Sequence, residues 1–222
     1  MDRRLRSAAA HVVVADVARP ALDDADDHHL RRVLRLRDGA AVTVTDGAGA
    51  WRPCRWCGDT LSVDGEIERV APPATPVTIA VAPPKGDRLD WLVQKVTEIG
   101  VDHIALLDAD HSVVRLRGER AGRQVERLER IARQAVMQSR RVFVPKIASA
   151  VRACDVLPTM VAAEPGGPPP GADDRAIAIG PEGGWSDREL GAATATVSLG
   201  PNILRVETAA VVAAVLIGGR SR

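Results

Sequence analysis

The fold is decided by the stretch Ala176-Ile-Ala-Ile-Gly-Pro-Glu-Gly-Gly-Trp-Ser186, which runs on into Asp-Arg-Glu189. Its apolar start is typical of a buried strand, and Ser186 followed three positions later by Glu189 is a capping box that opens a helix. The glycine-rich turn between them joins a strand to a helix, which is where open α/β sheets bind ligands. Glycines let a ligand approach the backbone closely. Spacing alone leaves a binding site and a turn without function equally open.

A second unit of the same kind follows. Strand Thr196–Leu199 leads into Gly200-Pro-Asn-Ile-Leu-Arg-Val-Glu-Thr208, and an almost wholly apolar helix runs from about Glu207 to Ile217. Arg205 and Glu207 carry charge at the start of an element that must be buried, which is costly unless the charge is paired or used. The two residues form a structural pair, or Glu207 serves the helix dipole, or they act on a ligand; the residues alone leave these alternatives open.

The residues upstream alternate between strand and helix patterns. The expected strands are Val77–Ala82, His103–Leu107, Val142–Ile147 and Met160–Ala163. One helix is expected from the cap Asp87 to the closing Gly100, and a long one over Gly118–Ser139. Such alternation predicts an α/β domain with a mostly parallel sheet and helices on both faces.

The first part of the chain reads mostly as strands separated by turn signals. The expected elements are strands at Val12–Ala15, Ala41–Thr45, Trp51–Trp56 and Thr60–Val70, and one helix at about Ala25–Leu34. They predict a small β-barrel. The proline-rich stretch 71–76 is typical of a stiff linker, so we expect domains at residues 1–72 and 73–222. We read the apolar run near the N-terminus as a strand rather than a signal peptide, because His11 and Asp16 interrupt it, and we expect a cytoplasmic protein.

The composition of the 222-residue chain excludes several classes of protein. It is 45% apolar and 27% charged, which excludes wholesale disorder, and its net charge of +1 excludes a general polycation. Aromatic residues make up only 2%, which argues against a protein that stacks successive bases on aromatic rings. The stretch Cys54-Arg-Trp-Cys57 lacks the second pair that a structural zinc site usually needs, and we expect no metal.

One segment departs from this charge balance. Between Arg115 and Arg141 there are nine Arg and three Glu, a local excess of six positive charges. Four arginines fall within one narrow sector of a helical wheel, namely Arg120, Arg123, Arg127 and Arg130. A solvated helix face is the plain alternative. The acids cannot match the arginines, however, and the planar guanidinium fork suits phosphate, so we predict that this face contacts a polyanion.

The two C-terminal loops, Ile179–Ser186 and Leu199–Ala209, resemble those of the RsmE-type family, which are ribosomal small-subunit RNA uridine N3-methyltransferases of the SPOUT class. Further segments resemble the same family in its order and spacing, namely His28-His-Leu-Arg-Arg-Val-Leu-Arg-Leu36, Lys85-Gly-Asp-Arg-Leu-Asp-Trp91, Lys95-Val-Thr-Glu-Ile-Gly-Val101 and Gln138-Ser-Arg-Arg141. The resemblance covers about residues 3 to 217. The paired C-terminal motifs are highly specific together.

The resemblance implies an N-terminal PUA-like small β-barrel and a C-terminal SPOUT α/β domain. The latter has a deep trefoil knot that holds the cofactor site, at about residues 160–217, although general topology rules argue against knots. It also implies S-adenosylmethionine as methyl donor, a homodimer, and methylation at N3 of a specific uridine of 16S ribosomal RNA in the small subunit. Because N3 lies on the pairing edge, the target base must be unpaired or flipped out.

The same resemblance implies that three loops hold the cofactor, namely Ala163–Pro165, Ile179–Gly184 and Leu199–Leu204. The expected cofactor-binding residues are Ala163, Glu164, Ile179, Gly180, Glu182, Gly183, Gly184, Leu199, Gly200, Ile203 and Leu204. Arg205 is the candidate for steadying the anionic base or a phosphate, and Glu207, or else Glu182, for orienting it or accepting the proton. Beside the basic helix face, the expected RNA contacts are Arg3, Arg4, His29, Arg35 and Arg140. A structural, partly buried histidine is the alternative for His29.

The chain departs from the family's usual pattern in three places. Asn202 replaces an Arg, Asp110-His-Ser112 replaces Glu-Arg-Ser, and Val206 replaces a Thr. Asn202 matters most, because the change can remove a phosphate or substrate contact. Two alternatives therefore stand beside this methyltransferase: a catalytically weakened RNA-binding or ribosome-assembly factor, and a SPOUT methyltransferase that modifies another atom of RNA.

Overall fold

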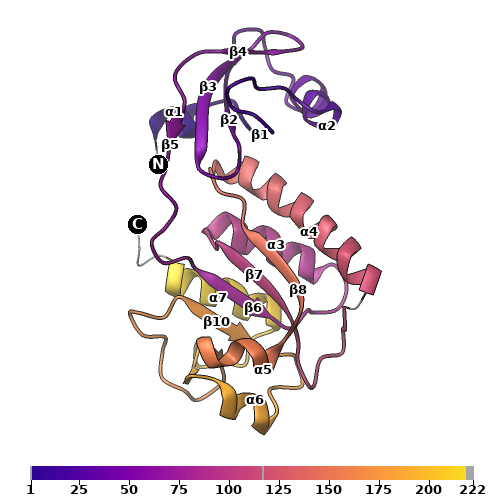
Figure 1. The fold of residues 1–222 in the computed structure, drawn as a ribbon, viewed down its shortest axis with the longest axis vertical. Helices are drawn as coiled ribbons and strands as arrows, with labels where there is room; N and C mark the ends of the chain where they lie inside the picture. The colour runs from indigo at the N-terminus through magenta and orange to yellow at the C-terminus, as the bar shows by residue number, and fades with distance from the viewer. Residues whose placement is uncertain (1, 117, 219–222) are drawn as a thin grey trace. The chain divides into compact units, whose positions relative to one another are not determined.

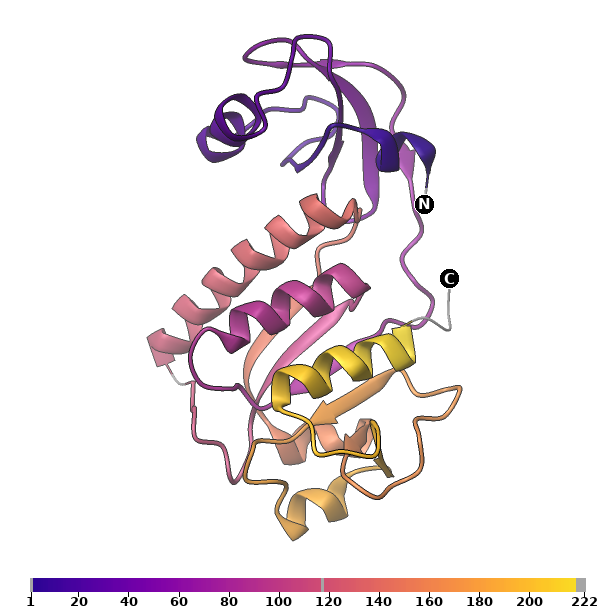
Figure 2. The same cartoon turned by 180° about the vertical axis from the view of Figure 1, so that it is seen from behind.

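The computed structural model describes residues 2–116 and 118–218, which form two compact units (Figure 1, Figure 2). The first unit contains the described residues up to Pro73 together with Arg133–Val144, and the second contains the rest. The expected division at residues 72 and 73 had placed 133–144 in the second domain. The last residues of the expected domain 73–222, and Arg117 of the basic segment, lie outside the described residues.

The first unit is built on a five-stranded sheet in which β5 pairs with β3 beside the path β1-β2-β3-β4. Its strands are β1 (Ala10–Val13), β2 (Ala41–Thr45), β3 (Ala50–Trp56), β4 (Leu61–Val63) and β5 (Glu68–Arg69). Its helices are α1 (Arg3–Ser7), α2 (Asp24–His28) and the π-helical turn η1 (His29–Val33). Two predictions are corrected: the expected strand Thr60–Val70 is two short strands, because Asp64-Gly65 turns the chain, and the expected helix Ala25–Leu34 changes from α- to π-helical pitch.

The segment Arg133–Val144 belongs to the first unit through specific contacts. The ring of His11, in β1, lies 2.8 Å from the carbonyl oxygen of Arg141 and 2.8 Å from the hydroxyl of Thr43. The Arg133 guanidinium lies 2.5 Å from a carboxylate oxygen of Asp26. Val142 is buried in a small cluster with two side chains of the first unit. The expected strand Val142–Ile147 is therefore wrong at its start, and the strand begins only at Lys146.

The second unit is a parallel α/β domain. Its sheet has the order β11-β9-β10-β6-β7-β8, and every neighbouring pair is parallel. The strands are β6 (Thr78–Val81), β7 (His103–Asp108), β8 (Lys146–Arg152), β9 (Val161–Ala163), β10 (Ala176–Ile179) and β11 (Thr196–Val197). The helices are α3 (Arg88–Ile99), α4 (Gly118–Ser139), α5 (Ala153–Val156), the 3-10 turn η2 (Leu157–Thr159), α6 (Asp187–Ala192) and α7 (Val206–Gly218). The end of α4, from Arg133 onward, belongs to the first unit. The bounds predicted for α4 and β10 are confirmed.

Helices cover both faces of this sheet, as predicted. Ile79 and Val81 of β6 pack in one cluster with apolar residues of α3, α7 and the first part of α4, which share one face (Figure 2). Ala80, between them, packs in another cluster with residues of α5 and α6, on the opposite face (Figure 1). Alternate side chains of a strand point to opposite faces, so one buried strand feeds both cores. Among the described residues, no helix combines the length and the apolar character needed to cross a bilayer.

Candidate active site

Three loops of the second unit enclose a cavity of about 480 Å³. They follow the adjacent parallel strands β9, β10 and β11, so all three leave the sheet at its carboxyl edge. The lining comprises residues 163–165, 179–185 and 198–206 except Pro201, with Ala209 of α7 behind them. A cavity of this size is in the range that holds a small organic ligand.

Every cofactor-binding residue expected from the sequence lies in this lining. The set is Ala163, Glu164, Ile179, Gly180, Glu182, Gly183, Gly184, Leu199, Gly200, Ile203 and Leu204. Sequence reasoning missed other members of the lining, among them Trp185 and Ser198. Asn202, the departure from the family pattern, also lines the cavity and is exposed. The structure thus brings the three predicted loops together around one space.

The middle loop owes its shape to glycines and to Trp185. A Cβ on Gly180 would lie 2.9 Å from the Trp185 ring, so only glycine lets the backbone pass this close to the indole. Gly184 has φ +74°, a conformation that glycine adopts readily. Trp185 donates a hydrogen bond from its indole nitrogen to the carbonyl oxygen of Ala163, at 3.1 Å. The indole therefore ties the middle loop to the first loop, and Ser186 caps α6 directly after it.

The charged residues around the cavity differ in their exposure and in their contacts. Arg205 lines the cavity and is exposed, and its guanidinium makes no hydrogen bond or ion pair within the described part of the chain. Glu207 stands in the first turn of α7 and is 9% exposed. Glu182 is exposed in the lining. The structural pair between Arg205 and Glu207 considered from the sequence is absent among the described residues.

Arg88, the first residue of α3, is a charged residue near the cavity that sequence reasoning also missed. Its Nη1 atom lies 3.9 Å from Glu182 Oε1 and 3.9 Å from Glu207 Oε1. The second carboxylate oxygen of Glu207 is buried and has no hydrogen-bond partner among the described residues. Arg88 thus connects the middle loop to the last helix. Its signal in the sequence was the motif Lys85–Trp91, which resembled the family without indicating a role.

The arginines of α4 predicted to contact RNA are all exposed. Arg127 forms an ion pair with Asp90 of α3, and Arg123 lies 3.5 Å from Glu119. The side chains of Arg120 and Arg130 make no ion pair or hydrogen bond within the described ranges. Two of the four guanidinium groups are therefore unpaired, and RNA contact by this face stays a prediction.

The RNA contacts predicted in the first unit have different surroundings. Arg3, His29 and Arg35 are exposed, and Arg35 has a positive φ of 50°. Arg4 pairs with two carboxylates and lies 5.0 Å over the ring of Trp51. Arg140 is partly buried and donates to the carbonyl oxygen of Ala8 at 3.0 Å, and this burial lowers the pKa of Arg140. Arg140 therefore has a structural contact that the sequence did not indicate.

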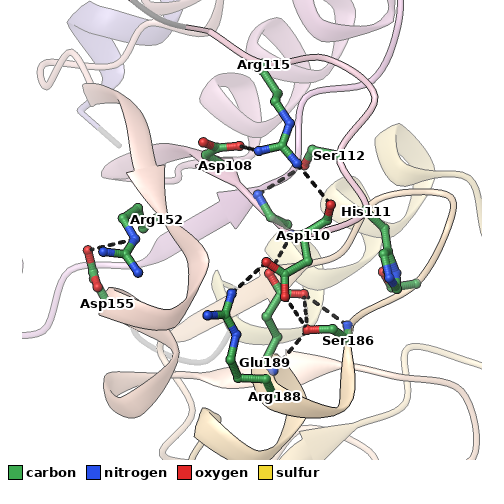
Figure 3. Close-up of polar contacts among 12 residues, drawn as sticks. Asp108, Asp110, His111, Ser112, Arg115, Arg152, Asp155, Ser186, Arg188 and Glu189 are labelled. Carbon is green, nitrogen blue, oxygen red and sulfur yellow. Dashed lines mark hydrogen bonds and ion pairs between the residues drawn. The ribbon is translucent and has the colours of Figure 1, made fainter.

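A network of charged residues lies beside the middle loop, at the carboxyl ends of β7 and β8 (Figure 3). Its members line a second cavity of about 260 Å³, among them Arg115, Arg152 and Arg188. Asp108 pairs with Arg115, and Asp110 pairs with Arg188. Nowhere in residues 2–116 and 118–218 do three His, Cys, Asp or Glu side chains gather as a metal site would require.

Comparison with known proteins identifies the family. The family model described as RNA methyltransferase domain matches residues 71–218, and the RNA methyltransferase PUA domain matches residues 22–55. A relative from Synechocystis named Ribosomal RNA small subunit methyltransferase E is 30% identical, over 96% of this chain and 76% of its own length. The chain belongs to the RsmE-type RNA methyltransferase family.

Solved structures agree with this family. A protein from Porphyromonas gingivalis described as a "probable rRNA-methyltransferase" has a TM-score of 0.79 and 31% identity, and the match covers 96% of this chain and 98% of that one. Ribosomal RNA small subunit methyltransferase E from Neisseria gonorrhoeae, solved with S-adenosyl methionine bound, has a TM-score of 0.74 and 24% identity, covering 92% and 94%. The second likeness shows the RsmE-type fold.

Proposed function

We propose that this chain transfers the methyl group of S-adenosylmethionine to N3 of a specific uridine in 16S ribosomal RNA of the small subunit. The observation that carries the proposal is the cavity of about 480 Å³ formed by the three loops of the family motifs. Relatives named for small-subunit ribosomal RNA methylation support the substrate class. The relative solved with the cofactor supports the methyl donor.

The residues around the cavity fit such a cofactor. Its walls combine small apolar side chains with glycine backbone, and Glu164 and Glu182 supply carboxylates that suit an amino group. Gly180 passes so close to the indole ring that a side chain would clash there, so the middle loop presents backbone at this point of the lining. We assign the loops at 163–165, 179–184 and 199–204 to holding the cofactor. When bound, it supplies a methyl group activated on a positively charged sulfur.

The chain's own residues must manage the uridine proton and the charge left behind. Removing the N3 proton makes the base an anion, and Arg205, unpaired beside the cavity, would stabilise that charge or an adjacent phosphate. Glu182 or Glu207 would take the proton. Both carboxylates lie near Arg88, which would orient them. The deprotonated N3 would then be the nucleophile for the methyl group that the bound cofactor would supply.

The finer architecture forms part of the same proposal. We propose that the first unit closes as a PUA-like small barrel that grips RNA, and that residues 160–217 form a deep trefoil knot around the cofactor. The two RNA methyltransferase family models support the pairing of these domains. We further propose a cytoplasmic homodimer in which basic residues of both units contact the ribosomal RNA.

Nucleoside mass spectrometry of ribosomal RNA tests the function. In a strain lacking this gene, 3-methyluridine should vanish from 16S ribosomal RNA and return with a plasmid copy. A plasmid carrying Arg205→Ala should not restore it. If 3-methyluridine is unchanged in the deletion strain, the substrate assignment is wrong. If another methylated nucleoside disappears instead, the chain is a methyltransferase with a different target atom.

A further inference from the structure

The loop between β7 and α4 is fastened to the glycine-rich loop of the cavity. Asp110 and His111 supply the contacts on one side, and residues 184–189 supply them on the other. These two stretches lie more than seventy positions apart along the chain. The contact is therefore a tertiary one, and the sequence noted Asp110-His-Ser112 only as a departure from the family pattern.

Asp110 is the centre of this contact (Figure 3). Its carboxylate accepts a hydrogen bond from the Ser186 hydroxyl at 2.6 Å and from the Arg188 guanidinium at 2.7 Å. Its backbone N–H donates to the Glu189 carboxylate at 2.9 Å. The hydrogen bond from Ser186 and the charge of Arg188 lower the pKa of Asp110, so the carboxylate stays ionised. Glu189 is 1% exposed and also caps the backbone N–H of Ser186.

His111 extends the contact into the cavity loop itself. Its Nδ1 atom lies 3.1 Å from the carbonyl oxygen of Gly184. A Cβ placed on Gly183 would lie 3.2 Å from the Cβ of His111, so the two backbones are packed closely there. Gly183 and Gly184 both line the cavity. The loop is thus supported from outside by His111, while Trp185 ties it to Ala163.

We propose that Asp110 is a positioning residue for the cofactor, holding Gly183 and Gly184 in the conformation that binds S-adenosylmethionine. The inference rests on the proposed function. Asp110 does not line the large cavity, and it acts through Ser186, Arg188 and the backbone of the loop. If Asp110 orders the loop before binding, the binding free energy is not reduced by the cost of ordering the loop. Loss of the contact should therefore weaken the affinity for S-adenosylmethionine.

If Asp110 only stabilised the fold, a different result would be expected. Asp110 is exposed and belongs to none of the apolar clusters, so its removal should leave the core intact. Asp108 provides a matched control, because it pairs with Arg115 at 2.9 Å in the same stretch of chain, and no contact joins it to the glycine-rich loop among the described residues. If both aspartates only stabilise the fold, Asp108→Ala and Asp110→Ala should have equal effects on cofactor binding.

Calorimetric titration with S-adenosylmethionine, steady-state kinetics and hydrogen exchange test the proposal in the full chain. Asp110→Ala should weaken binding about tenfold, the scale expected for one charge-assisted hydrogen bond. It should raise KM for the cofactor while leaving KM for RNA unchanged. Asp110→Glu, which keeps the carboxylate, should recover part of the affinity, and Asp108→Ala should bind like the parent protein.

The ligand-free protein gives an independent readout. Asp110→Ala should increase amide exchange at Gly183–Trp185, and Asp108→Ala should not. Unchanged exchange there, or equal loss of affinity in the two alanine variants, overturns the positioning role. If the parent protein binds no S-adenosylmethionine but exchange responds as expected, the cofactor assignment fails while the fastening of the loop by Asp110 stands.

Discussion

Replacing His11 by Gln should remove a defined part of the protein's sensitivity to acid. His11 is 2% exposed and lies between the Thr43 hydroxyl and the carbonyl oxygen of Arg141, each at 2.8 Å. A carbonyl oxygen only accepts, so Nε2 carries the proton and Nδ1 accepts from the hydroxyl. A neutral ring satisfies both contacts, and burial disfavours the charged form. Burial lowers the pKa of His11 from 6.5 to about 4.

The sign and size of the effect follow from these two pKa values. Below pH 6.5, the pKa of His11 in the unfolded chain, the unfolded chain binds a proton at His11 and the folded chain does not. The free energy of unfolding therefore falls as the pH falls towards about 4. Lowering the pH from about 7.5 to about 5 should remove about 2 kcal/mol from the free energy of unfolding. The contribution of His11 is fully present above the unfolded pKa.

Urea unfolding at the two pH values measures this term. Trp51 and Trp56 are buried in the same unit and report its transition by fluorescence. The parent protein should lose about 2 kcal/mol more than His11→Gln on acidification. His28→Gln, which changes an exposed histidine of the same unit, should behave like the parent. Equal losses in the parent and in His11→Gln would refute the assignment of a neutral buried ring.

Three further predictions concern the cavity and the basic helix. Gly180→Ala should weaken S-adenosylmethionine binding about tenfold in calorimetric titrations, because its Cβ would lie 2.9 Å from the neighbouring indole. The control Gly191→Ala, whose Cβ would meet no atom within 4 Å, should bind like the parent protein. Arg88→Ala should lower kcat about tenfold through misplaced carboxylates, with partial recovery in Arg88→Lys, and an unchanged kcat would remove Arg88 from the site. Arg120→Gln and Arg130→Gln should each lower the salt slope of RNA binding by about 0.7; unchanged slopes in filter-binding titrations would make that face merely solvated.

Much of the second unit was predictable because its signals are local. The helix Gly118–Ser139 and the strand Ala176–Ile179 have the predicted bounds, since apolar periodicity marks the helix and a short apolar run before a glycine marks the strand. The strand predicted at Val142–Ile147 was wrong at its start, because an apolar run does not indicate which of two cores buries it. Its first residue packs in the first unit, while the strand proper starts at Lys146.

The candidate site divides in the same way. The three loops were predictable from motifs that are contiguous in sequence, and the structure brings them around one cavity. Arg88 and Asp110 were not predictable as parts of the site, because their importance comes from contacts with residues far along the chain. A carboxylate or guanidinium in a loop has the same appearance in the sequence whether it is solvated or holds another loop in place.

Transfer of a labelled methyl group tests the central claim most directly. Small ribosomal subunits from a strain lacking this gene would be incubated with the purified protein and S-adenosylmethionine labelled in its methyl group, and the 16S ribosomal RNA analysed as nucleosides by mass spectrometry. We predict label in 3-methyluridine, and none with Arg205→Ala. Label in a different nucleoside, or no transfer by a protein that binds the cofactor, would contradict the account.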